Sequence, residues 1–207
     1  MFRARLERAW GPEAKELSEE VIARLETLDE LVSRWGQAVR LVGFKTPRER
    51  DRRYFAEALA VLRWLPNAGH ALDIGSGGGS PALPLAIARP AVKWTLVEAN
   101  ERKALFLEEA VRALSLRHVT VLHARYEAVE PPLRFDVVTV RGVAVGRATL
   151  EKVARELGPG GGRLLWMSSE AVLTAGRDTL GRAWAHCAGP IPLVRDGAFL
   201  LVAGVRS

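Results

Sequence analysis

Apolar residues recur along the chain in two different patterns, and the change between them falls near residue 68. In the first part, five apolar residues follow one another at alternating spacings of four and three: Val21, Leu25, Leu28, Val32 and Trp35. This spacing places them on one side of a helix. It predicts an amphipathic helix over residues 17–35, with Ser18 as its N-cap and Gly36 at its end. A second helix is expected from about residue 48 to residue 65.

After residue 70, short apolar strands alternate with helical patterns. Strands are expected at residues 71–74, 94–97, 119–123, 135–140 and 163–167. Helices are expected at about 81–88, 102–114 and 149–157, and a closing hairpin at 193–194 and 199–205 with Asp196-Gly197 at its turn. This alternation is typical of a doubly wound sheet. We therefore predict an α/β fold, in which residues 68–207 form a Rossmann-like domain and residues 1–67 a small N-terminal helical cap.

Composition narrows the range of partners. The 207 residues carry a net charge of +6, with a pI near 10.1, and the excess is almost entirely arginine. Such a balance is compatible with a polyanion such as nucleic acid. The chain has neither an apolar run long enough for a membrane span nor a recognisable signal peptide. We expect a cytoplasmic monomer without a membrane partner. The single cysteine, Cys187, rules out an intrachain disulfide.

A glycine-rich segment follows the first predicted strand of the sheet and leads into a helix. It reads Asp73-Ile74-Gly75-Ser76-Gly77-Gly78-Gly79-Ser80. Glycines at such a junction let a ligand approach the backbone closely. A dinucleotide fingerprint would place its third glycine at position 80, where this chain has serine, and the P-loop pattern is absent.

An acidic residue just before the loop indicates which ligand it binds. The carboxylate of Asp73 would repel a pyrophosphate and attract a cation. S-adenosylmethionine (SAM) carries a sulfonium and an ammonium group. The segment therefore favours SAM over a nicotinamide cofactor, with Asp73, Gly75, Gly77 and Gly79 as cofactor-binding residues.

Polar residues after later strands extend this predicted site. Glu98 ends the second strand, where its carboxylate can accept hydrogen bonds from both ribose hydroxyls. Glu127 follows the third strand and borders the same crevice, where it could contact the adenine. Arg141 ends the fourth strand and could hold a phosphate, a base edge or the cofactor carboxylate. No metal is expected, because the histidines lack the spacing of metal ligands.

Five short segments match the motifs of one known family. They are residues 31–36 (Leu-Val-Ser-Arg-Trp-Gly), 73–85, 102–107 (Arg-Lys-Ala-Leu-Phe-Leu), 125–127 (Arg-Tyr-Glu) and 141–144 (Arg-Gly-Val-Ala). Over residues 17–167 the chain resembles the ribosomal RNA small-subunit methyltransferase G family, also called RsmG or GidB. Members are bacterial SAM enzymes that methylate N7 of a guanine in the decoding-region hairpin of 16S rRNA. The resemblance implies cofactor contacts at Gly75, Ser80, Tyr126, Glu127 and Arg141.

The implied partner is 16S rRNA or the small ribosomal subunit. Guanine N7 carries a lone pair and no proton, so its methylation needs no general base. We assign Arg125 and Arg141 as the residues that position the target for catalysis. Residues 45–53, together with Arg3, Arg5 and Arg8, are the predicted phosphate-contacting surface.

Some positions depart from the family pattern. Ser80 replaces a phenylalanine, Ser168 replaces a lysine, and residues 40–42 and 54–59 differ from the expected motifs. Two alternatives therefore stay open: a SAM-dependent methyltransferase of a small molecule or protein, and a non-enzymatic RNA-binding paralogue. SAM affinity would separate the non-enzymatic paralogue from the two methyltransferase hypotheses. A labelled RNA product would separate the rRNA methyltransferase from a methyltransferase of a small molecule or protein.

Overall fold

The structure, a computed structural model, describes residues 1–38, 43–44, 46–130, 134–158 and 161–205. The sequence features noted at residues 40–42 and at Lys45 lie outside these described residues. Among the described residues, no helix is both long and apolar enough to cross a membrane.

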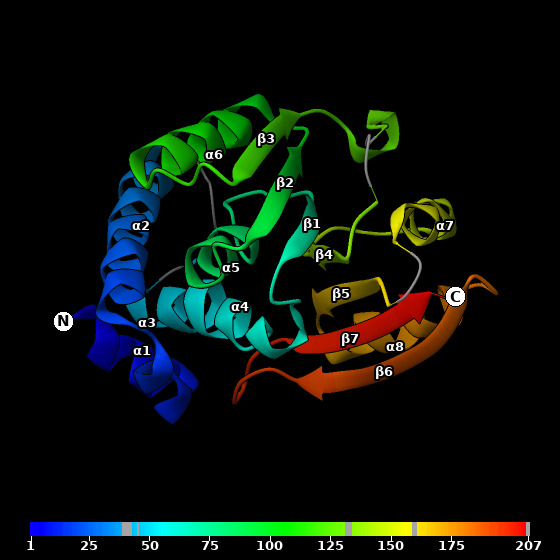
Figure 1. Ribbon diagram of the computed structural model, residues 1–207. Helices are drawn as coiled ribbons and strands as arrows, with labels where there is room; N and C mark the ends of the chain where they lie inside the picture. Colours follow the sequence, from blue (N-terminus) through cyan, green and yellow to red (C-terminus); the bar gives the residue numbers. More distant parts are fainter. Residues whose placement is uncertain (39–42, 45, 131–133, 159–160, 206–207) are drawn as a thin grey trace.

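A seven-stranded sheet forms the centre of the molecule (Figure 1). Its strands are β1 (Gly69–Ile74), β2 (Val92–Glu98), β3 (Val119–His123), β4 (Val137–Arg141), β5 (Arg163–Ser168), β6 (Trp184–Pro192) and β7 (Phe199–Val205). They lie in the order β3-β2-β1-β4-β5-β7-β6, and the first five are parallel. Strand β7 is antiparallel to both of its neighbours. The order reverses between β1 and β4, which confirms the predicted doubly wound α/β fold.

Each side of the sheet has its own hydrophobic cluster. On one side, α5 (Ala82–Ala88) and α6 (Glu101–Ala113) pack with alternate strand residues such as Trp94. On the other, α7 (Arg147–Glu156) and α8 (Glu170–Thr179) pack with the intervening residues, Val138 among them. The period-two alternation of each strand therefore supplies both clusters.

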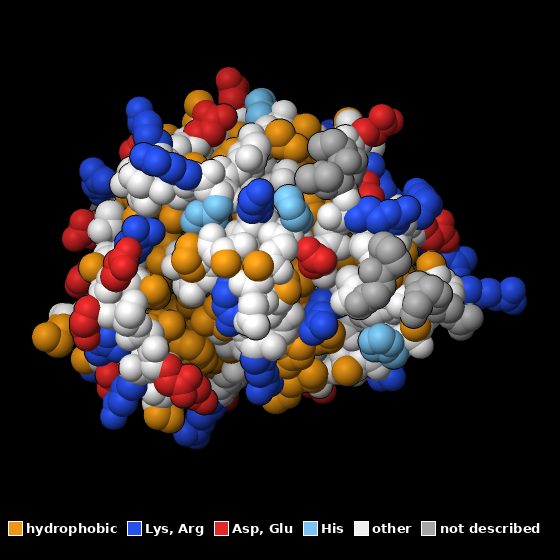
Figure 2. Space-filling model, viewed as in Figure 1, with side chains coloured by type: hydrophobic (Ala, Val, Ile, Leu, Met, Phe, Trp, Pro, Cys, Tyr) orange, Lys and Arg blue, Asp and Glu red, His pale blue; other side chains and the backbone are white. Residues whose placement is uncertain are grey.

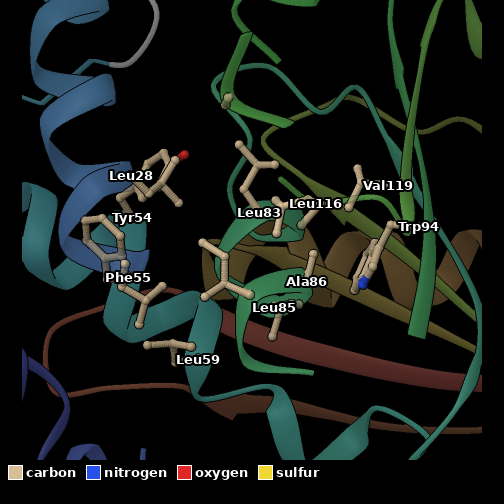
Figure 3. Packing of buried hydrophobic residues seen from close by; sticks show 14 of the residues in the cluster. Leu28, Tyr54, Phe55, Leu59, Leu83, Leu85, Ala86, Trp94, Leu116 and Val119 are labelled. Atoms are coloured by element: carbon tan, nitrogen blue, oxygen red, sulfur yellow. The ribbon is translucent and has the colours of Figure 1, made fainter. Parts of the chain in front are cut away.

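The N-terminal helices lie outside α5 and α6. They are α1 (Phe2–Trp10), η1 (Pro12–Glu16), α2 (Glu19–Ala38), α3 (Pro47–Arg50), the π-helical η2 (Asp51–Ala56), α4 (Glu57–Leu59) and η3 (Leu62–Trp64). Figure 3 shows Leu28 and Phe55 of these helices beside Leu83 and Leu85 of α5. One hydrophobic cluster thus runs from α1 to the sheet, across the predicted boundary at residue 67.

Four details differ from the sequence predictions. Helix α2 continues past Gly36 to Ala38, because Gly36 does not adopt the positive φ of a helix-ending glycine. The second helix is divided by the π-helical turn at Asp51–Ala56. Helices α1 and α8 were not predicted. The first strand of the closing hairpin was predicted at residues 193–194 but lies at Trp184–Pro192, so residues 193–194 belong to the turn.

Candidate active site

The glycine loop connects the end of β1 to the start of α5 at the point where the strand order reverses. Gly75, Gly77 and Gly79 all have positive φ, at +67°, +54° and +88°. A Cβ at Gly75 would come within 2.4 Å of Val143, and one at Gly79 within 2.4 Å of Leu83. Side chains at these two positions would therefore clash as well as strain the backbone.

A pocket of about 630 Å³ opens above this loop. That volume is in the range of small-molecule sites. Its walls include most of the predicted site residues: Gly75, Gly77, Ser80, Glu98, Arg125, Tyr126, Glu127 and Arg141. Asp73 and Gly79 do not line it. Asp73 lies buried at the end of β1, and Gly79 faces Leu83 and Leu107.

Asp73 is a buried carboxylate with one unpaired oxygen. Its Oδ1 accepts a 2.5 Å hydrogen bond from Thr139 Oγ1, whereas its Oδ2 is buried without a partner among the described residues. Burial raises the pKa of Asp73 to about 6, while the bond from Thr139 acts in the opposite direction. An uncompensated buried charge of this kind favours a nearby cation.

Glu98, at the end of β2, holds the loop in shape. Its Oε2 accepts from the Gly77 amide at 2.7 Å, and its Oε1 accepts from the Asn100 amide at 2.8 Å. A carboxylate has about four acceptor positions, so each oxygen retains capacity for a further donor. Glu98 can therefore shape the loop and still accept from a ligand hydroxyl in the pocket.

Arg141, at the end of β4, is the centre of a buried polar network. It donates to Ser80 Oγ at 2.8 Å and to Glu57 Oε2 at 2.5 Å. Ser80 Oγ donates in turn to the Tyr54 carbonyl, and Tyr54 Oη donates to the Gly78 carbonyl at 2.6 Å. Burial lowers the pKa of Arg141, and the Glu57 carboxylate opposes that shift. The side chain is thus held against the loop before any ligand arrives.

Glu57 is a functional-site residue that sequence reasoning missed. It is only 2% exposed and lies within the run Phe55-Ala56-Glu57-Ala58-Leu59, which is otherwise apolar and fully buried. Its Oε1 accepts from the Ala198 amide in the β6–β7 turn at 3.1 Å. The available signal was an acidic residue inside an apolar helical run, because such a residue needs a buried partner.

The segment after β3 contributes both a fixed and an exposed part. Tyr126, in η4 (Tyr126–Ala128), is buried and donates to Glu156 Oε2 at 2.6 Å. Burial and this carboxylate raise the pKa of Tyr126 above its ordinary value. Arg125 and Glu127 on either side are exposed at the pocket rim. Tyr126 therefore anchors the segment, and its two charged neighbours stay available to a ligand.

The pocket fits SAM on the chemistry of its own residues. An unpaired buried carboxylate oxygen lies below the loop, and a second carboxylate ends the neighbouring strand. Among the described residues, no group of three His, Cys, Asp or Glu side chains could hold a metal ion. Among the described residues that line the pocket, none is a histidine or a cysteine, the side chains most often used in covalent catalysis. The arrangement can hold a cationic cofactor and align a nucleophile that needs no base.

Solved structures with a similar architecture include RNA methyltransferases. The tRNA (m1A58) methyltransferase TrmI from Aquifex aeolicus superposes with a TM-score of 0.62 at 16% identity, covering 87% of this chain and 76% of that one. The 16S rRNA N2 G1207 methyltransferase RsmC of T. thermophilus gives 0.57 at 22% identity, covering 80% and 44%. The fold is that of the class I SAM-dependent methyltransferases.

Sequence comparison identifies the family within this class. Residues 21–176 match the family described as rRNA small subunit methyltransferase G. The protein of that name from Xanthomonas campestris pv. campestris (strain B100) is 36% identical over 154 residues, covering 74% of this chain and 72% of that protein. Its counterpart in Xylella fastidiosa (strain M23) is 37% identical over 134 residues, covering 65% and 63%. The chain belongs to the rRNA small subunit methyltransferase G family, and it is a SAM-dependent methyltransferase, as predicted.

Proposed function

We propose that this chain transfers the methyl group of SAM to N7 of a guanine in 16S rRNA of the small ribosomal subunit. The observation that carries the proposal is the family match, because every residue lining the 630 Å³ pocket falls inside residues 21–176. The excess of arginine suits an RNA substrate. A ribosomal substrate also supports the expected cytoplasmic location.

Within this proposal, the charged residues at the predicted site have separate physical roles. The charge of Asp73 favours the cationic cofactor, and Glu98 accepts from its ribose hydroxyls while it holds the Gly77 amide. Glu127 lines the rim and is proposed to contact the adenine. Arg141 is held by Glu57 and Ser80, and its guanidinium keeps further N–H groups that could donate to the cofactor carboxylate or to the target base.

SAM supplies an electrophilic methyl group when it is bound. The lone pair of guanine N7 would accept this methyl group, and the electron pair of the carbon–sulfur bond would stay with the departing donor. No proton moves, which agrees with a pocket whose described lining contains no histidine. The protein's task is to align N7 with the methyl carbon and to exclude water. Arg125, exposed at the pocket rim, is proposed to position the target nucleotide.

The test is methyl transfer from labelled SAM to small ribosomal subunits that lack the modification, followed by digestion to nucleosides. We expect label in 7-methylguanosine. Label in another nucleoside would show that a different atom of the RNA is methylated. If SAM binds but no label enters RNA, the substrate is to be sought among small molecules or proteins.

The matched control is Asp73→Asn, which keeps the side chain's size and removes its charge. It should weaken SAM binding at pH 7 and reduce label in RNA in parallel, while subunit binding is unchanged. Label that persists unchanged in this variant would point to a contaminating enzyme.

A further inference from the structure

A second hollow, of about 1,260 Å³, lies between α1, the segment from Thr46 to Arg52 and the β6–β7 turn. We propose that this hollow, called here the arginine groove, binds the phosphate backbone of the RNA substrate. The inference rests on the proposed function and adds the surface on which the RNA lies. The groove is lined by Arg5, Arg8, Ala9, Thr46, Pro47, Arg48, Glu49, Asp51, Arg52, Arg195 and Asp196.

The distribution of charge over the surface does not by itself locate an RNA site. Figure 2 shows Lys and Arg side chains scattered among acidic ones over the face in view. Long basic side chains on such a surface are commonly neutralised by nearby carboxylates. The useful distinction is therefore between arginines that already have a carboxylate partner and those that do not.

Three of the predicted phosphate-contacting arginines, Arg3, Arg5 and Arg50, are used inside the protein. Arg3 donates to Glu19 and to two backbone carbonyls, and Arg5 pairs with Asp51 at 2.5 Å and Asp29 at 2.9 Å. Arg50 also pairs with Asp29. These arginines connect the N-terminal helices to one another, so they are not free to bind phosphate.

Three other arginines of the groove have no carboxylate partner among the described residues, and a fourth lies 3.9 Å from one. Among the described residues, Arg8, Arg48 and Arg52 form no ion pair, and the buried Nε of Arg52 donates to no acceptor. The side chain of Arg195 is 97% exposed, and its Nε lies 3.9 Å from a carboxylate oxygen of the neighbouring Asp196. The groove's Asp51 is already neutralised by Arg5. Unpaired guanidinium groups around a hollow are suited to bidentate contacts with phosphate.

The lining also indicates how the RNA is recognised. No described lining residue is aromatic, so bases find no aromatic ring to stack on, and only Ala9 and Pro47 offer apolar side chains. The groove therefore suits a charged backbone better than a base, a membrane or an apolar protein surface. Contacts of this kind position a nucleic acid without reading its sequence.

The groove opens at the same edge of the sheet as the methyl-donor pocket. Phe199, which follows the β6–β7 turn, pairs with Ser168, the last residue of parallel strand β5. Arg52 lines the groove, and the next residue, Arg53, lines the pocket. The Ala198 amide of the turn is bonded to Glu57, which also holds Arg141. Phosphates in the groove would thus place a neighbouring nucleotide at the mouth of the pocket.

Salt dependence of RNA binding tests the groove directly. Each phosphate contact contributes roughly 0.7 to 0.9 to the slope of log affinity against log salt. The probe is 16S rRNA without modification, bound at several salt concentrations by the full chain and by the double variant Arg8→Gln/Arg48→Gln. Both side chains are exposed, so the folded structure should persist. We expect the variant to bind about tenfold or more weakly, with a slope lower by about 1.5.

The matched control is Arg112→Gln/Arg117→Gln. Arg112 lies in the last turn of α6, as Arg8 lies in the last turn of α1, and Arg117 precedes β3 at the opposite edge of the sheet. Both are exposed, and the net charge changes equally. The control should keep the slope of the unchanged protein. Equal salt-dependence slopes for the two double variants would contradict the proposal that the arginine groove binds RNA phosphates.

These outcomes are separate from the proposed function. If subunits are labelled at guanine N7 but the groove variant binds RNA like the control, the proposed RNA site is wrong and the proposed reaction is correct. If only the groove variant shows a lower salt-dependence slope but no RNA is labelled, the groove binds RNA and the proposed reaction is wrong. A third variant, Arg52→Gln, should lower the slope by a further 0.7 to 0.9 or so, which a change in stability alone would not do.

Discussion

The guanidinium of Arg141 joins three of the positions at which this chain departs from the family motifs. Ser80 accepts one of its hydrogen bonds, Glu57 accepts another, and Ser80 itself donates to the carbonyl of Tyr54. These departures are therefore neighbours in space and form one network. A serine at position 80 provides the hydroxyl that bridges Arg141 to the helix, which a phenylalanine could not do.

Glu57→Gln is predicted to weaken SAM binding by at least tenfold. The amide keeps an oxygen for the Ala198 N–H, but it leaves the buried Arg141 without its counterion. Removing one partner of a buried pair costs roughly 3 to 5 kcal/mol, so the free energy of unfolding should also fall. SAM affinity is measured by titration calorimetry, and stability by urea denaturation.

The control is Asp29→Asn, which breaks the buried contacts of Asp29 with Arg5 and Arg50 away from the pocket. It should lower stability comparably and leave SAM affinity unchanged, whereas Glu57→Asp should recover part of the affinity. If SAM affinity follows stability in all three variants, Glu57 has only a structural role.

Residue positions at strand ends could be predicted, and contacts between distant helices could not. Glu98 and Arg141 were placed at the pocket because each ends a recognisable parallel strand. Asp73 was assigned to the cofactor, but its burial below the loop depends on Thr139, far along the chain. Glu57 was missed because its partner is 84 residues away. The sequence around Glu57 indicates that this residue needs a buried partner, but it does not identify the partner.

At the scale of elements, the strand, loop and helix formed by β1, the glycine segment and α5 act as one unit. Within it the glycines differ in what surrounds them. A Cβ at Gly79 would approach Leu83 at 2.4 Å and Leu107 at 3.2 Å, whereas one at Gly77 would meet only the Gly75 carbonyl at 3.7 Å. Gly77 lines the pocket and Gly79 does not.

Gly79→Ala should therefore reduce mainly the stability, and Gly77→Ala mainly the SAM affinity. At Gly79 both backbone strain and overpacking apply, so stability should fall by about 3 kcal/mol. At Gly77 the strain alone costs about 1 kcal/mol, but the new methyl enters the pocket and SAM affinity should fall several-fold. Urea denaturation and calorimetric titration measure the two quantities. Equal loss of stability in both variants would contradict this assignment.

The elements that sequence analysis missed have weak local signals. Helix α1 buries only Phe2 and Leu6, and α8 buries only Leu173 and Gly176. Two buried positions are too few to define a period. Strand β6 contains Gly189 and Pro190, which normally argue against a strand and are accepted here because β6 is the last strand of the sheet. The central strands β1, β4 and β5, which are rich in buried apolar residues, were placed to within two residues at each end.

At the scale of the whole molecule, the helical N-terminal part and the sheet share one hydrophobic cluster. Phe2 of α1 packs edge-on against Phe55, with ring centroids 5.0 Å apart, and Phe55 belongs to the same cluster as Leu165 and Leu200 in the sheet. Trp35 of α2 contacts Phe106 of α6 in the same way, at 5.7 Å. Few contacts of this kind would exist if residues 1–67 were an independent domain.

We therefore predict that the two parts unfold together. In urea, circular dichroism and tryptophan fluorescence should give one coincident transition, since three of the six tryptophans lie on each side of residue 67. Phe2→Ala should lower the free energy of unfolding by roughly 3 to 5 kcal/mol. Because the cluster is continuous, it should shift both signals equally, and amides of α2 and β4 should exchange at the same urea concentration. Earlier exchange in α2 would show instead that the helical part opens alone, and the boundary at residue 67 would then be a true domain boundary.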